Sequence, residues 1–114
     1  MQLGIRLHDT TRLPFAERIA DVHRLGFACG HLALAKVIDE FPTTDEALTP
    51  GLAMYIKNVF AENHVDIAVL GCYLNLADPR QESLEKTIHR YIAHIRFASW
   101  LGCGVVGTET GAPN

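Results

Sequence analysis

The chain has 114 residues, of which 48% are hydrophobic and 20% are charged, and its net charge is only −3. A chain of this size can bury one modest core, so we expect a single folded unit over residues 1–114. The charge provides no basic face for nucleic acid, and no apolar run reaches the roughly 18 residues that a membrane helix needs.

Short apolar segments alternate with longer amphipathic segments along the chain. The predicted strands cover residues 3–7, 31–37, 66–70 and 105–106. The predicted helices run from Pro14 to Leu25, from Pro50 to about His64 and from about Asp78 to Leu101. The polar loop at 43–45 is long enough to contain a short helical turn. This order, β-α-β-α-β-α-β, predicts an α/β protein with a parallel sheet and right-handed crossovers.

The third predicted helix carries an apolar stripe that we expect to be buried. The stripe consists of Leu84, Ile88, Tyr91, Ile92, Ile95 and Ala98. The three cysteines are odd in number, widely spaced and set among apolar neighbours, which favours reduced thiols and a cytoplasmic protein.

Residues 102–107 match G-x-G-x-x-G, the fingerprint of dinucleotide-binding turns. That fingerprint needs a strand before its first glycine and a helix after its last. Here a predicted helix precedes Gly102 and a predicted strand includes Val105 and Val106, so the order is reversed. The glycines are better explained by their backbone freedom, which lets one of them end the helix and another form a tight turn into the strand.

In parallel α/β proteins, ligands bind at the carboxyl ends of the strands. The candidate binding residues at these ends are His8, Cys72, Tyr73, Asn75 and Glu109. Simpler roles are open: His8 could bond a loop carbonyl, Cys72 could fill space and Asn75 could cap its loop. Glu109 is the strongest candidate, because a carboxylate at the mouth of a buried strand needs a partner.

The other histidines give weaker signals. His23, His89 and His94 lie on predicted outer helices and His64 ends one, so we expect all four to face solvent. We expect His31 at the amino end of its strand, away from the site. The chain has no complete zinc-ligand set of its own.

Four segments, "IRLHD", "GFACGHLAL", "IAVLGCYLNLADP" and "VVGTETG", occur in order along the alternation. Together they resemble the first half of the xylose isomerase-like barrels, which include sugar-phosphate isomerases and epimerases and endonuclease IV. The resemblance implies the first half of a TIM (β/α)8 barrel, and the chain would then be truncated or a natural half-barrel.

The resemblance also implies a function. A full-length protein would isomerise or epimerise a sugar or sugar phosphate by proton transfer next to a carbonyl, while this chain alone would be inactive. A divalent metal (Mn, Mg, Co or Zn) would be bound mostly by residues outside this chain, with Glu109 as a ligand within it. His8, Cys72, Tyr73, Asn75 and Glu109 would bind substrate.

Two alternatives remain open. The chain could be a non-catalytic half-barrel that acts only with a partner chain, or an endonuclease IV-like phosphodiester hydrolase. The hydrolase is disfavoured by the charge of −3 and by Leu70, which stands where the resemblance puts a metal-binding histidine. A four-stranded sheet with two unsealed edges also predicts self-association, most simply a homo-oligomer.

Overall fold

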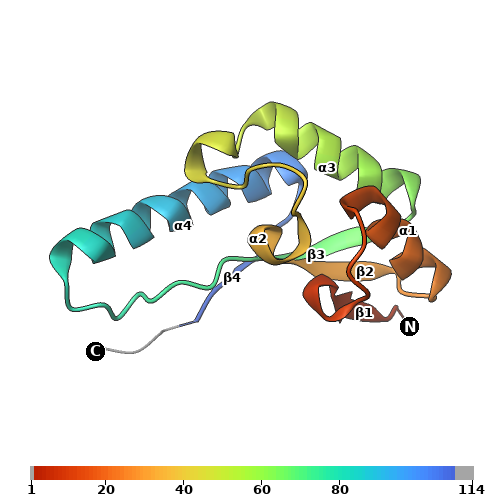
Figure 1. Cartoon of the computed structure of the whole chain (residues 1–114), viewed down its shortest axis with the longest axis horizontal. Helices are drawn as coiled ribbons and strands as arrows, with labels where there is room; N and C mark the ends of the chain where they lie inside the picture. The colour runs from red at the N-terminus through yellow and green to blue at the C-terminus, as the bar shows by residue number, and fades with distance from the viewer. Residues whose placement is uncertain (1, 110–114) are drawn as a thin grey trace.

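The structure, a computed structural model, describes residues 2–109 and contains one four-stranded parallel sheet in the order β1-β2-β3-β4. The strands are β1 (Gly4–Arg6), β2 (Cys29–Leu32), β3 (Asp66–Gly71) and β4 (Val106–Gly107). The helices between them are α1 (Phe15–Arg24), α2 (Leu34–Val37), α3 (Pro50–Glu62) and α4 (Gln81–Leu101), with single 3-10 turns η1 (Leu7–Asp9) and η2 (Asp45–Ala47). Figure 1 shows the strands beneath the long helices, with β1 lowest and β4 at the left. The predicted parallel α/β alternation is confirmed.

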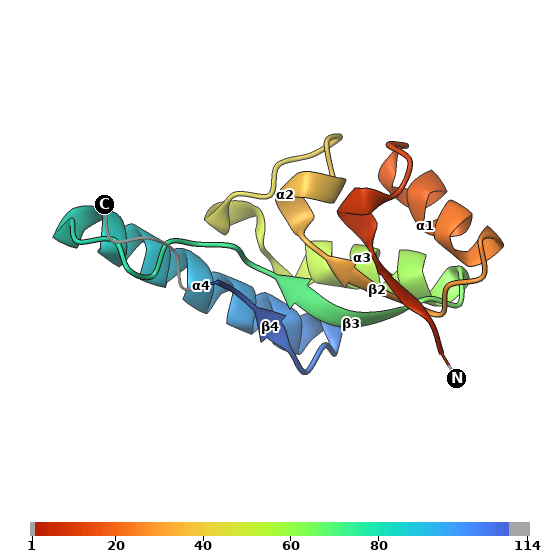
Figure 2. The same ribbon diagram turned by 90° about the horizontal axis from the view of Figure 1, so that it is seen from below.

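The long helices all lie on one face of the sheet (Figures 1 and 2). Strand register places Gly4 opposite Cys29 and Arg6 opposite His31. These four residues are exposed or half-buried, whereas Gly30 and Leu32, which alternate with those of β2, are buried, so the four share the other face. No helix of residues 2–109 covers that face (Figure 2). We call this side the open face. A sheet in a barrel has the same arrangement, with helices outside and the second face turned inward.

The core lies between the sheet and the helices. Its largest fully buried side chains are Phe15, Phe97, Leu7, Ile19, Leu32, Leu34, Ile56 and Leu70. Each strand contributes to this core from one face only, so the hydrophobic effect fixes which face meets the helices.

The three long helices end in the same way. The residue that closes each helix has a positive φ, 92° at Gly26, 56° at His64 and 76° at Gly102. A backbone hydrogen bond then crosses the end of the helix. After α3, for example, the N–H of Val65 donates to the carbonyl of Phe60 at 3.1 Å. This is the Schellman ending, which usually has glycine at the left-handed position. The helix ends predicted at 25–26, 63–64 and 101–102 are therefore confirmed.

The second predicted strand is partly wrong. The strand begins at Cys29 and ends at Leu32, and residues Leu34–Val37 form a helical turn. A continuous apolar run does not by itself distinguish a buried strand from a buried helical turn. The short turn expected near 43–45 is found as η2.

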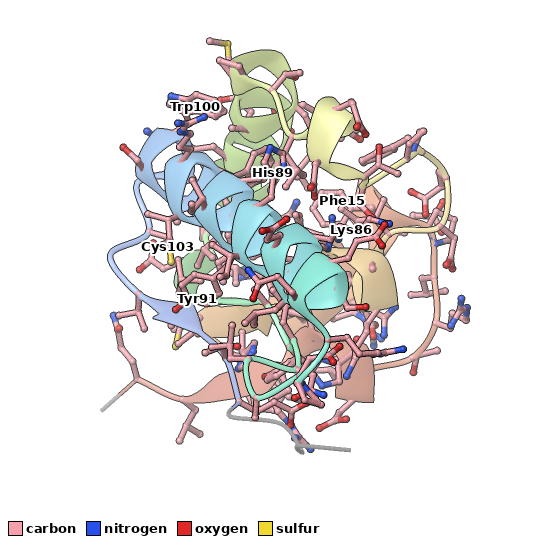
Figure 3. The ribbon with its side chains drawn as sticks, turned by 90° about the vertical axis from the view of Figure 1, so that its left-hand side faces the viewer. Phe15, Lys86, His89, Tyr91, Trp100 and Cys103 are labelled. Carbon is pink, nitrogen blue, oxygen red and sulfur yellow. The ribbon has the colours of Figure 1, made fainter. Side chains whose placement is uncertain are left out.

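The prediction that one stripe of α4 is buried is also wrong in part. Ile88, Ile92 and Ile95 are 45%, 44% and 47% exposed. Ala98 of the predicted stripe is buried as expected, but the other buried residues of α4, His94, Phe97 and Leu101, lie outside the stripe. Figure 3 views the molecule from the α4 side, with Tyr91 and Trp100 labelled on the helix. Because α4 carries apolar residues on two faces, residues 2–109 leave one of these faces uncovered.

Candidate functional site

His31 lies inside the site, contrary to the expectation that it would lie away from it. It is the third of the four residues of β2, and its side chain is on the open face. The hydroxyl oxygen of Tyr73, in the loop after β3, lies 2.6 Å from Nε2 of His31. The two rings are also stacked, with centroids 5.7 Å apart and planes at 24°. A histidine of β2 and a tyrosine of the loop after β3 therefore form one hydrogen-bonded unit.

His8 completes a cluster of three rings. Its ring centroid lies 5.9 Å from that of His31 and 6.5 Å from that of Tyr73, both edge-to-face. The Nδ1 atom of His8 is buried and has no hydrogen-bond partner among the described residues. A buried polar atom without a partner is uncommon, and it marks a place where a ligand or water can bind.

The backbone around His8 is held by residues behind it. The Thr10 hydroxyl donates to the carbonyl of Leu7 at 2.6 Å. The buried guanidinium of Arg18 donates from Nε to that hydroxyl at 2.8 Å. These bonds fix the η1 turn at the end of β1 and thereby the position of the His8 ring.

Gly71 makes the His31–Tyr73 contact possible. A Cβ atom at this position would collide with Nε2 of His31 and lie 3.2 Å from Cε2 of Tyr73. The side chains of His31 and Tyr73 occupy the space that a side chain at this position would need. This explains why the last residue of β3 is glycine.

Both histidines of the cluster favour the neutral form. Burial lowers the pKa of His8 below 6.5, and the charges of Lys36, Arg6 and Arg18 lower it further, against the opposite effect of Asp9. Burial also lowers the pKa of His31, with added effects from His8, Arg6 and Lys36. Neutral imidazoles can accept protons at neutral pH.

Lys36 adds positive charge to the same place. Its ammonium nitrogen lies 4.8 Å from the centre of the Tyr73 ring, a cation–π contact. His8, His31, Lys36 and Tyr73 form what we call the carboxyl-end cluster. They lie within or just after three different strands, and the cluster combines two proton acceptors with a cation.

Cys72 borders this cluster. It is only 4% exposed, and with Arg90 and His94 of α4 it lines a pocket of about 140 Å³ that Lys36 and Tyr73 also line. Burial raises the pKa of its thiol to about 11. The thiol stays protonated at neutral pH, so Cys72 is a poor nucleophile.

The remaining predicted residues lie along the same edge of the sheet. Asn75 is half-buried, and its side-chain oxygen accepts a bond from the backbone N–H of Ala77 at 3.1 Å. Glu109 is exposed and follows β4 by two residues. Of the five predicted residues, the structure thus brings His8 and Tyr73 together, while Cys72 lines a pocket that Tyr73 also lines. The roles of Asn75 and Glu109 stay predictions.

His94 was expected to face solvent, but it is 2% exposed. Its Nδ1–H donates to the carbonyl of Arg90 at 2.9 Å, and burial lowers its pKa. His89 is exposed as expected, and it pairs with Asp45 of η2 at 3.0 Å. Within residues 2–109 no three histidine, cysteine or acidic side chains lie close enough to bind one metal ion.

Comparison with known proteins identifies the fold. No protein-family model and no curated protein sequence matches the chain. Solved structures do match, and one described as a xylose isomerase-like TIM barrel/4-hydroxyphenylpyruvate dioxygenase fusion protein superposes with a TM-score of 0.66 at 16% identity. The chain has the fold of half a xylose isomerase-like TIM barrel.

A second matching structure is that of the probable 3-DHS dehydratase AsbF, involved in petrobactin synthesis, from Bacillus anthracis. It superposes with a TM-score of 0.62 at 18% identity. Both matches cover 95% of this chain, but they cover only 16% and 38% of the other two chains. The likeness at these identities establishes the fold, and the open face corresponds to a barrel interior. None of the helices in residues 2–109 is both long and apolar enough to cross a membrane.

Sequence reasoning missed His31 because the strand was expected to begin at that residue. The available signal was the run of small residues before it, Cys29 and Gly30, which now form the start of β2. A strand that began two residues earlier would have placed His31 near the carboxyl end, beside the residue that follows β1.

Proposed function

We propose that the chain forms part of the active site of a xylose isomerase-like barrel that isomerises or epimerises a sugar or sugar phosphate. The observation that carries the proposal is the carboxyl-end cluster, in which His8, His31, Lys36 and Tyr73 meet at the edge of the sheet where barrel enzymes bind substrates. The half-barrel fold supports the same assignment.

The chemistry requires that a base remove a proton from carbon next to a carbonyl. The C–H electron pair then forms the C=C bond of an enediol, and the carbonyl electrons move onto oxygen until a proton returns to carbon. His31, neutral and bonded to Tyr73, would move protons between substrate oxygens. Lys36 would stabilise the developing oxyanion or a substrate phosphate. The base that acts on carbon would come from outside this chain.

A divalent metal does not fit the described residues alone. They contain no group of three ligands, and Nε2 of His31 is already bonded to Tyr73. A metal in the assembled site would be bound mostly by residues outside this chain. Glu109, exposed beyond β4, is the carboxylate that this chain would add.

The uncovered surfaces support assembly with further polypeptide. The open face of the sheet and the exposed Ile88, Ile92 and Ile95 of α4 would be covered when a barrel is completed. The same observation favours the second candidate, a non-catalytic half-barrel that acts only in a complex. The hydrolase alternative gains no support, since Leu70 is fully buried in the core.

The test is a calorimetric measurement of ribose 5-phosphate binding to the assembled protein. We expect saturable binding that weakens at least tenfold in His31→Gln and Lys36→Met and persists in Lys86→Met, which changes an exposed lysine of α4. Formation of an isomerised sugar phosphate would support the proposal that the assembled protein is an enzyme. Binding without turnover in the completed barrel would favour the non-catalytic module, and equal binding by all variants would contradict the assignment of the cluster.

A further inference from the structure

A second pair of histidines lies at the opposite, amino-terminal edge of the sheet. His23 is in the last turn of α1, which leads into β2, and His64 follows α3, which leads into β3. Their ring centroids are 5.7 Å apart, with planes at 52°. The two rings border a pocket of about 190 Å³ whose other lining residues are Gly26, Phe27 and Ala28.

The ring nitrogens of this pair are available to a ligand. Both histidines are exposed, and no hydrogen bond or ion pair within residues 2–109 engages either imidazole. Metal–nitrogen bonds are about 2 Å long, so two imidazoles that share one ion place their ring centres about 5 to 6 Å apart. The separation of His23 and His64 is in this range.

The backbone at His64 gives an independent reason to look for a role. His64 has a φ of 56°, in the left-handed region that favours glycine. The two equivalent helix ends have Gly26 and Gly102 at this position. His64 thus occupies a strained position that glycine would fill without strain, and there it brings an imidazole beside His23.

We propose that His23 and His64 together bind a transition-metal ion of the Zn²⁺, Ni²⁺ and Cu²⁺ class, for which imidazole is a preferred ligand. No third histidine, cysteine or acidic residue of the described chain joins the pair. Water would therefore fill the other coordination positions, and the site would be exchangeable. It is separate from the carboxyl-end cluster, because the two sites lie at opposite ends of β2 and β3.

The experiment is a calorimetric titration of the full chain with Zn²⁺. His23→Gln and His64→Asn remove one ligand each, and asparagine tolerates the left-handed backbone. We expect both variants to bind Zn²⁺ at this site at least tenfold more weakly than the wild type. The control His89→Gln, which changes an exposed histidine of α4, should bind like the wild type.

Thermal unfolding separates metal binding from a role in the helix end. Zn²⁺ should raise the unfolding midpoint of the wild type and of His89→Gln. It should raise the midpoint of His23→Gln much less. His64→Gly should unfold at a higher temperature than the wild type without metal, because it relieves the strain, and should lose the Zn²⁺ effect. Unchanged Zn²⁺ affinity in His23→Gln and His64→Asn would overturn the proposal and leave His64 as a helix-ending residue.

Discussion

Tyr73 and His31 are 42 residues apart in the chain, yet the Tyr73 hydroxyl lies 2.6 Å from Nε2 of His31. Gly71 allows this contact, because a side chain there would occupy the space of both rings. The contact joins the ends of β2 and β3 at the point where the proposed substrate would bind.

We therefore expect Gly71→Ala to destabilise the chain by about 1–3 kcal/mol, the usual cost of overpacking. It should also change the ring resonances of His31 in NMR spectra. The matched control is Gly104→Ala, because a Cβ at Gly104 meets no atom within 4 Å. Equal, small effects of both substitutions would show that the space beside Gly71 is not filled as described.

The pH dependence of stability follows from three histidines. His8, His31 and His94 all have pKa values below 6.5 in the folded chain, chiefly because they are buried. The unfolded chain therefore binds protons more readily than the folded chain once the pH falls below about 6.5. The free energy of unfolding should be greatest above this pH and should decrease from there toward the lower, folded-state pKa values.

Urea denaturation at a series of pH values from 8 to 5 measures this effect. His94→Asn keeps a donor for the carbonyl of Arg90 but does not titrate, so its stability should fall less steeply with acid than that of the wild type. A steeper fall, or none in either protein, would contradict the assignment of His94 as a buried neutral group.

Glu109 provides a test of the metal proposal. In a barrel completed by further polypeptide, Glu109→Gln should lower divalent-metal affinity or turnover by about tenfold or more. Its stability should change by at most about 1 kcal/mol, because the side chain is exposed. Glu85→Gln on α4 is the control and should alter neither quantity. Intact metal binding and turnover in Glu109→Gln would remove this residue from the site.

The exposed isoleucines of α4 should drive association. Replacing Ile88, Ile92 and Ile95 with glutamine should shift the mass measured by light scattering at micromolar concentration toward the monomer. Stability of the monomer should change little, since these side chains are nearly half exposed. A wild-type chain that is a stable monomer and unfolds cooperatively would contradict the need for a covering partner.

The fold was predictable because its signals are local. Thr49 and Pro50 start α3 as expected, with the Thr49 hydroxyl oxygen accepting from the N–H of Leu52 at 3.2 Å. Gly26 and Gly102 end α1 and α4 as expected. Such signals depend on backbone geometry at single positions, so one sequence is enough to reveal them.

The site and the buried side of α4 depend on tertiary packing and were harder to predict. His31 and Tyr73 meet only because β2 and β3 are neighbours and Gly71 leaves space. His94 is buried although histidine on an outer helix usually faces water, because its Nδ1–H finds a carbonyl within α4. The two apolar faces of α4 give similar patterns, and only packing against α3 and the sheet selects between them.

The central claim, that the open face becomes a barrel interior, is tested most directly by alkylation of Cys29. This half-buried thiol lies on the open face, whereas Cys72 and Cys103 are buried in the chain itself. The rate of Cys29 modification by iodoacetamide should be measured by mass spectrometry from nanomolar to high micromolar protein. Completion of the barrel predicts that this rate falls at least tenfold as the chain associates, while an unchanged rate in the associated protein would contradict the claim.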